Sequence, residues 1–407
     1  MSLILPFRAL RPTTERAQEV VAPPYDVLNC EEARQRVADR PLSFLHISKA
    51  EIDLPVGTDP YDESVYAKAA ENLQQMKNDG VLQRDEKPCY YVYRLKMGEH
   101  IQTGLVAVAS AADYDTNRIR KHEFTRPAKE DDRVRQIEAL KAQTGPVLLA
   151  YRAMSEVDEL LDSVTTQTPV YDLVADDGVG HTLWVINEGA IIDQLTNYFD
   201  EMAAIYIADG HHRSAAGSRV AASMGGSPDA MSSYFLSVIF PHDQMKILDY
   251  NRVVKDLGQY APAEFIEGIK KHFTVVPETA AVSPARAGEF GMYLEGSWYR
   301  LSVNPTNIPE DPVARLDVSL LADNLLEPLL GISDPRRDSR IDFVGGIRGL
   351  AELERRVDSG EMAAAFSLFP TSMEDLMAVA DAQQVMPPKS TWFEPKLADG
   401  LISHVLD

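Results

Sequence analysis

The stretch IADGHHR (residues 207–213) gathers an aspartate, a glycine, two histidines and an arginine directly after a short apolar run. Residues 204–208 (AIYIA) are typical of a buried strand, and residues 214–222 (SAAGSRVAA) are typical of a helix. The stretch therefore predicts a strand-to-helix junction that carries several ionisable groups, and the rest of the fold is worked out from it.

A junction of this kind can bind an anion. Gly210 permits a left-handed backbone, the N–H groups that follow point outward at the helix start, and Arg213 adds a charge-assisted fork. Asp209 could hold a divalent metal or accept a proton, and His211 or His212 could move protons. A purely structural alternative, with Asp209 as helix N-cap and the histidines as packed polar residues, explains the aspartate but not the HHR sequence.

A second cluster, RKHEFT (residues 120–125), is followed by Lys129 and Arg133. A carboxylate among these cations should stay ionised, so Glu123 could act as a base towards a hydroxyl while His122, Lys129 and Arg133 hold phosphate oxygens. HEFT lacks the second histidine of HExxH, which excludes a zinc-protease motif. The alternative is a solvated charge run ahead of a helix.

Two proline-rich stretches are further candidates for the functional site. MPPKSTWFEPK (residues 386–396) offers donors to an anion from Lys389, Ser390, Thr391 and Lys396, or forms a C-terminal strap pinned by its aromatics. APPYDV (residues 22–27) is a rigid turn that presents Tyr25 and Asp26 as candidate substrate contacts. No Walker loop, GxGxxG, nucleophile elbow or CxxC pair is present.

The composition of the chain limits the classes of protein to which it can belong. The 407 residues include 40 Lys+Arg against 62 Asp+Glu, a formal net charge of −22, which disfavours nucleic acids and anionic membranes as partners. Two cysteines do not support a disulfide scaffold. With no apolar run of about 20 residues and no signal-peptide pattern at the start, we expect a cytoplasmic, soluble protein. The oligomeric state is open.

Helical and strand patterns alternate along the chain, which predicts an α+β fold with mixed sheets, interleaved helices and antiparallel hairpins. We expect three segments: 1–100, 101–250 and 251–407. The predicted helices before the junction are 31–38, 59–80, 133–143, 156–164 and 189–199, and the predicted hairpins turn at 97–99 and 177–178.

These stretches resemble a bacterial and archaeal family of domains of unknown function, the one numbered 1015. The similar pieces are PPYDV, KHEFT, IADGHHR, DYNR (residues 249–252) and MPPKSTWFEPKLADGL (residues 386–401). DGHHR is also similar to the signature of free serine kinases, which share a fold with ParB proteins and sulfiredoxin.

That resemblance implies a ParB/sulfiredoxin-like core and a kinase. It implies that Glu123 acts on a serine hydroxyl, that Asp209 is needed for phosphoryl transfer, and that His211, His212 and Arg213 surround the phosphates. Sulfiredoxin chemistry is excluded because residues 207–214 contain no cysteine.

The leading hypothesis is a phosphotransferase acting on a hydroxy amino acid, L-serine above all, with a nucleotide or pyrophosphate donor and Mg²⁺ held by Asp209. One alternative is a non-catalytic nucleotide-binding regulator of ParB-like type. The other is a metal-dependent hydrolase built on His122, Asp209, His211 and His212.

Overall fold

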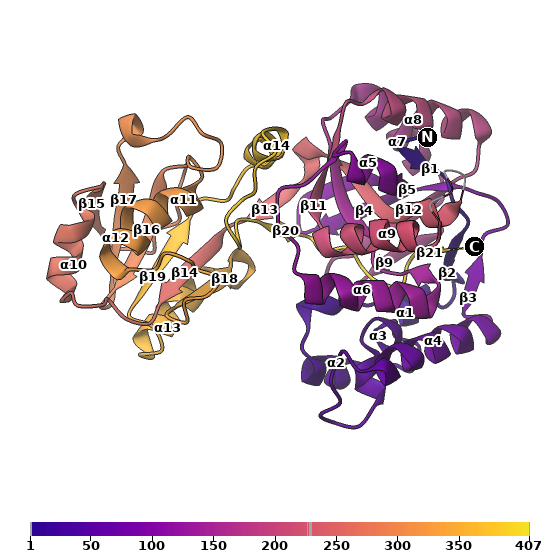
Figure 1. Ribbon diagram of the computed structural model, residues 1–407, viewed down its shortest axis with the longest axis horizontal. Coiled ribbons are helices and arrows are strands. Elements are labelled where there is room, and N and C mark those ends of the chain that lie inside the picture. Colours follow the sequence, from indigo (N-terminus) through magenta and orange to yellow (C-terminus); the bar gives the residue numbers. More distant parts are fainter. Residues whose placement is uncertain (1, 226, 228–229, 407) are drawn as a thin grey trace. The chain divides into compact units, whose positions relative to one another are not determined.

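The computed structural model describes residues 2–225, 227 and 230–406. The chain divides into two compact units: the first contains residues 1–245 and 395–407, and the second contains residues 246–394. The second unit is thus an insertion into the sequence of the first, which is completed only when the chain returns at Pro395 (Figure 1).

The first unit is built on a nine-stranded mixed sheet. Its strands are β1 (Ile4–Leu5), β4 (Tyr90–Met97), β5 (His100–Ser110), β6 (Ile119–Arg120), β8 (Val147–Tyr151), β9 (Tyr171–Val174), β10 (Gly180–Ile186), β11 (Ile205–Asp209) and β12 (Tyr234–Pro241). Their order is β6-β11-β8-β12-β5-β4-β10-β9, with β1 paired to β5. The β6–β11 and β8–β12 pairs are parallel and the others antiparallel.

Helices surround this sheet in the first unit. They are α1 (Ala17–Val20), α2 (Cys30–Val37), α3 (Leu45–Ser48), α4 (Glu63–Asn78), α5 (Ala111–Asp115), α6 (Pro127–Leu140), α7 (Ser155–Thr165), α8 (Gly189–Glu201) and α9 (His211–Ser223). Leu161 of α7 and Phe199 of α8 pack into the main core with alternate residues of the sheet. Helix α6 packs against α9 through Ile137 and Val220. This second contact places the segment after β6 beside the predicted junction.

A four-stranded sheet ties the end of the chain to its beginning. Its order is β3-β2-β21-β7, formed by β3 (Leu82–Arg84), β2 (Ala9–Pro12), β21 (Ser403–Val405) and β7 (Ala142–Gln143). Just before β21, the backbones of Ala22 and Asp399 exchange two hydrogen bonds of 3.1 and 2.9 Å. The segment 395–407 is therefore an internal part of the first unit.

The second unit has its own six-stranded antiparallel sheet, in the order β15-β17-β16-β19-β14-β18, and a separate β13–β20 pair. Its strands are β13 (Lys246–Leu248), β14 (Tyr250–Val254), β15 (Phe273–Glu278), β16 (Glu289–Leu294), β17 (Ser297–Val303), β18 (Ile341–Gly345), β19 (Ala364–Leu368) and β20 (Trp392–Glu394). Its helices are α10 (Pro262–Ile269), α11 (Asp317–Leu321), α12 (Glu327–Leu330), α13 (Leu350–Asp358) and α14 (Met373–Asp381), with a π-helical turn between α11 and α12.

The predicted α+β class with mixed sheets, hairpins and interleaved helices is confirmed. The hairpin turn at 97–99 is also confirmed, since Met97 pairs with His100. One helix begins earlier than expected: α6 begins at Pro127 rather than near residue 133. Proline fits the first turn of a helix, and the charged residues that follow carry no apolar periodicity that would have predicted a helix there.

The units differ from the expected three segments. Residues 97 and 100, at the first expected boundary, pair in one hairpin of the large sheet, so segments 1–100 and 101–250 share a unit. The boundary expected near residue 250 lies close to the division between Met245 and Lys246. Within the described residues, no helix is long and apolar enough to cross a membrane.

Candidate active site

The IADGHHR stretch forms the predicted junction. Strand β11 ends at Asp209, Gly210 takes a left-handed backbone with φ of 98°, and α9 begins at His211. Because Gly210 has no side chain, the N-cap position offers nothing to the first-turn N–H groups of α9. The helix start is therefore suited to an anion from outside the helix.

Arg213 folds back over Gly210. A Cβ at residue 210 would lie 3.0 Å from Nε and 3.1 Å from Cζ of Arg213, and Nη1 of Arg213 donates to the carbonyl oxygen of Pro146. The absence of a side chain at Gly210 thus makes room for the guanidinium group, whose Nη2 lies 3.9 Å from Oδ1 of Asp209.

We expect Gly210→Ala to lower the free energy of unfolding by about 1–2 kcal/mol, because alanine is strained at this φ, and to weaken pyrophosphate binding, because Arg213 must move. Urea titration and calorimetry measure the two effects. Gly225→Ala is the matched control: its φ is 93°, but an added Cβ meets nothing within 4 Å. If both variants bind pyrophosphate equally well, Arg213 does not hold the anion.

Asp209 lies among positive charges. Its Oδ2 accepts a hydrogen bond of 3.5 Å from Nζ of Lys396, and its carboxylate also accepts from the N–H of Gly210. Partial burial raises the pKa of Asp209, but the charges of Lys396, Arg213 and His211 outweigh it and lower the pKa to about 2. The side chain is still 38% exposed, so an ionised carboxylate faces any ligand at the junction.

The two histidines of DGHHR hold the loop that carries Glu123. Nε2 of His211 accepts from the backbone N–H of His122 at 3.4 Å, and Nε2 of His212 accepts from the backbone N–H of Arg126 at 3.0 Å. Each end of the loop is thus fixed to one histidine. This positioning role explains why two adjacent histidines follow the glycine.

Glu123 lies in that loop and its side chain is 51% exposed. Its Oε2 is 3.7 Å from Nδ1 of His211. Because Nε2 of His211 already accepts a hydrogen bond, the proton of the neutral ring belongs on Nδ1, facing Glu123. The geometry combines an exposed carboxylate with a buried neutral imidazole that orients it, an arrangement suited to a general base.

Burial keeps these histidines neutral. His122 and His211 are 2% and 3% exposed, with ring centroids 4.5 Å apart and perpendicular planes. Burial lowers the pKa of His122 from 6.5 to about 4, against smaller opposing effects from the Ile207 backbone and Asp209. Burial and the neighbouring His122 place the pKa of His211 well below its usual value.

These shifts predict acid sensitivity. Between pH 6.5 and 4 the unfolded chain takes up a proton at His122 that the folded chain refuses, so stability falls as the pH falls through this window. We expect the stability advantage of the wild type over His122→Gln to shrink by about 2 kcal/mol from about pH 7 to about pH 5, measured by urea titration. A constant difference at His122 would contradict the prediction.

The remaining predicted cations are distributed differently. Nζ of Lys129 lies 5.5 Å from the ring centroid of Tyr61, on the exposed side of α6. Arg133 forms an ion pair of 2.8 Å with Asp132, and its Cζ lies 4.0 Å from the ring centroid of Tyr25. Arg133 and Tyr25 therefore contact each other, and both lie beside Arg213 of the junction.

Lys389, Ser390 and Thr391 belong to the second unit, whereas Lys396 belongs to the first. In the second unit, the carbonyl oxygen of Lys389 accepts from Arg252 at 3.0 Å, and Oγ of Ser390 donates to Pro387 at 2.6 Å. The participation of residues 389–391 in a phosphate site stays a prediction.

The donor set argues against a built metal site. Within the described part of the chain, no group of three or more His, Cys, Asp or Glu side chains is placed to hold a metal. Nε2 of both His211 and His212 accepts a backbone hydrogen bond, which leaves the hydrolase hypothesis short of ligands. A single carboxylate such as that of Asp209 is enough for a Mg²⁺ ion that arrives bound to phosphates. Mg²⁺ commonly takes one or two carboxylates and completes its coordination shell with phosphate and water.

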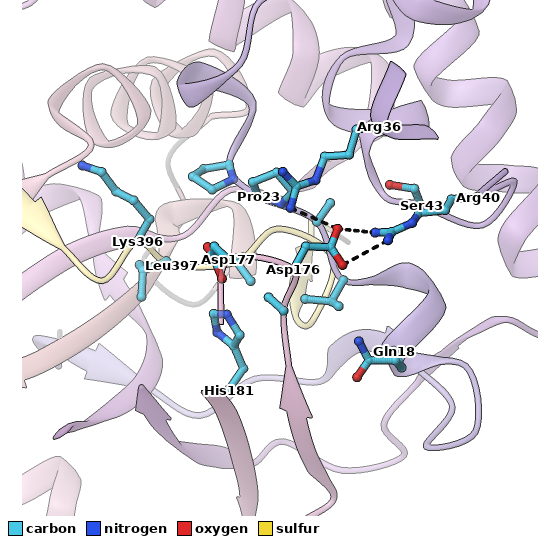
Figure 2. A pocket seen from close by; sticks show the side chains of 15 residues that line it. Gln18, Pro23, Arg36, Arg40, Ser43, Asp176, Asp177, His181, Lys396 and Leu397 are labelled. Atoms are coloured by element: carbon cyan, nitrogen blue, oxygen red, sulfur yellow. Dashed lines mark hydrogen bonds and ion pairs between the residues drawn. The ribbon is translucent and has the colours of Figure 1, made fainter. Parts of the chain in front are cut away.

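A neighbouring pocket is occupied by structural contacts. Asp176 forms ion pairs with Arg36 and Arg40 at 3.2 and 2.5 Å, and Figure 2 shows Lys396 on another wall of the same pocket. The ring of His181 is 3% exposed, and its Nδ1 lies 2.6 Å from the hydroxyl of Tyr93. Because these side chains already have partners within the protein, we interpret the pocket as part of the packing that supports the segment carrying Lys396.

Sequence reasoning missed Asp399. It lies in the LADG end of the C-terminal stretch, is 2% exposed and is electrostatically coupled to Arg213, Asp26 and Arg133. Its only sequence signal is an acidic residue within an apolar segment, which does not reveal a partner nearly 200 residues earlier.

The model of the family described as "Protein of unknown function (DUF1015)" matches residues 4–319, so the stretch 386–401 lies beyond the match. No curated protein matches the chain.

Solved structures give distant matches. A free serine kinase in complex with AMP is 16% identical with a TM-score of 0.36, covering 73% of this chain and 92% of that one. A conserved hypothetical protein from Pyrococcus furiosus is 16% identical with a TM-score of 0.34, covering 73% and 95%. C-terminally truncated SbnI from Staphylococcus aureus is 12% identical with a TM-score of 0.38, covering 72% and 85%. At these TM-scores the likeness does not decide the function, and the ParB/sulfiredoxin-like core stays a prediction.

Proposed function

The chain belongs to the DUF1015 family, and we propose that it is a phosphotransferase that moves a phosphoryl group from a nucleotide or pyrophosphate to the hydroxyl of a small molecule, L-serine or a similar hydroxy amino acid. One observation carries the proposal. The start of α9, the ionised Asp209 and the exposed Glu123 meet at a single junction, with the Glu123 loop fixed to His211 and His212.

Phosphoryl transfer asks a protein chiefly to position groups and to stabilise charge on the phosphate oxygens. The N–H groups at the start of α9 and the guanidinium of Arg213 supply positive potential there. Lys396, 3.5 Å from Asp209, adds a further cation. The junction thus combines donors for phosphate with a carboxylate for a metal.

Glu123 takes the proton of the acceptor hydroxyl. The hydroxyl oxygen of the acceptor then attacks the terminal phosphorus of the donor. The bond between that phosphorus and the bridging oxygen breaks, and the shortened donor leaves with the electron pair. His211 faces the Glu123 carboxylate, with Nδ1 3.7 Å from Oε2. Asp209 would hold a Mg²⁺ ion brought by the donor, and the ion would supply positive charge against the phosphate oxygens.

Phosphorus NMR tests the proposal directly. Purified protein is incubated with Mg²⁺ and L-serine, and ATP, ADP and pyrophosphate are supplied in turn. A phosphoserine signal is the expected result and identifies the donor. Consumption of the donor without phosphoserine would indicate hydrolysis or another acceptor. If no donor is consumed although nucleotide binds, the proposal fails and the nucleotide-binding regulator takes its place.

A further inference from the structure

A small cavity lies beside Arg213 in the first unit. It has a volume of about 30 Å³ and is lined by, among others, Asp399, Arg213, Arg133, Tyr25 and Gly145. This volume exceeds the roughly 10–15 Å³ that a cavity needs to hold one water molecule, so the cavity has room for a small polar group.

Asp399 has an unused acceptor at this cavity. The side chain is 2% exposed, and its carboxylate accepts a hydrogen bond from the backbone N–H of Tyr25. Among the described residues, Oδ2 has no hydrogen-bond partner. A buried oxygen left without a partner costs about 1–3 kcal/mol, which points to a donor that the protein itself does not supply.

The two arginines near Asp399 act on it by charge, while the ion pair of Arg133 and the backbone hydrogen bond of Arg213 join them to other groups. Arg133 on α6 is paired with Asp132, and Nη1 of Arg213 on α9 donates to Pro146. Tyr25 and Asp26, from the turn before α2, are the other titratable groups that act on Asp399. Burial and the negative charge of Asp26 raise the pKa of Asp399 to about 7, against the lowering effect of Arg213, the Tyr25 backbone and Arg133.

The size of the cavity and the charge around Oδ2 select the ligand group. At Oδ2 itself, a carboxylate or phosphate group would meet the negative charges of Asp399 and Asp26. A primary ammonium group is about the size of a water molecule and carries three donors. It is the small group that both satisfies Oδ2 and neutralises the carboxylate.

We propose that Asp399 binds the primary ammonium group of the acceptor substrate in this cavity, so that the acceptors are hydroxylated amines and amino acids rather than hydroxy acids. That the bound molecule accepts a phosphoryl group rests on the proposed function, but the ammonium site itself does not. Arg213 links the two places, because it lines the cavity and lies 3.9 Å from Asp209.

Calorimetry with three probes tests this site. L-serine, ethanolamine and glycerate are titrated into the protein with AMP present, since AMP has no phosphoanhydride to transfer. We expect the wild type to bind L-serine and ethanolamine but not glycerate. Because Asp399 must be ionised, ethanolamine should bind about tenfold more tightly at pH 8 than at pH 6. Asp399→Asn should weaken the binding of both amines at least tenfold.

Gly145→Ala tests the same site with every charge left in place. An added Cβ would lie 3.4 Å from Cδ of Arg213 and 3.7 Å from Oδ1 of Asp399, which is ordinary contact, so the variant should fold while part of the cavity is filled. We expect it to lose amine binding at least tenfold. Gly180→Ala is the matched control. Gly180 lies on strand β10, and an added Cβ would be at the same distance of 3.4 Å, there from Cβ of Lys96.

The outcomes separate the two proposals. If both variants bind L-serine as the wild type does, or if the wild type binds neither amine, the cavity holds only a structural water and the ammonium site is wrong. If amine binding depends on Asp399 and Gly145 but no phosphoserine forms with any donor, the ammonium site stands and the phosphotransferase fails.

Discussion

Asp209→Asn is expected to reduce phosphoserine formation by about 10²–10³-fold. The substitution keeps the size of the side chain and its ability to accept from the N–H of Gly210, but removes a charge that is present at every physiological pH. Without that charge, Lys396 and Arg213 lose the attraction of the Asp209 carboxylate, and the predicted Mg²⁺ loses its protein carboxylate. Phosphorus NMR under the conditions that give a wild-type signal measures the loss.

Asp193→Asn is the matched control, since Asp193 is an exposed aspartate on α8. It should leave phosphoserine formation unchanged. Full activity in Asp209→Asn would remove Asp209 from the mechanism and, with it, the predicted metal ligand.

Glu123→Gln is expected to lower kcat by about 10²–10⁴-fold while nucleotide binding is retained. The loop that carries Glu123 is fixed through the backbone N–H groups of His122 and Arg126, so loss of the carboxylate should not displace it. Calorimetry with nucleotide and phosphorus NMR with L-serine separate binding from turnover.

Glu138→Gln, at an exposed glutamate on α6, serves as the control and should behave as the wild type. If Glu123→Gln turned over at the wild-type rate, Glu123 would not be the base. Loss of nucleotide binding together with activity would instead assign it a structural role.

The geometry of the junction could be predicted because its residues are neighbours in the sequence. Asp209 ends the strand and Gly210 precedes the helix as the IADGHHR pattern indicates. The functions of the histidines could not be predicted, because their partners are the backbone N–H groups of a loop nearly 90 residues earlier.

Long-range contacts set the limits of prediction elsewhere. Lys389 and Lys396 are seven residues apart in one proline-rich stretch, yet the division at Pro395 assigns them to different units. Asp399 depends on Tyr25 and Arg213, and no local pattern connects these three residues. Burial and tertiary charge, rather than motif spacing, determine what each side chain does.

The insertion of the second unit has a consequence for how the protein is made. Lys396, Asp399 and strand β21 emerge from the ribosome only after the 149 residues of the second unit have been translated. At about 5–20 residues per second, that delay lasts roughly 7 to 30 seconds. Throughout it, the nascent first unit lacks the strand between β2 and β7 and the lysine beside Asp209. A chain still under synthesis therefore has an incomplete junction, which delays any activity until the residues that follow the second unit have been made.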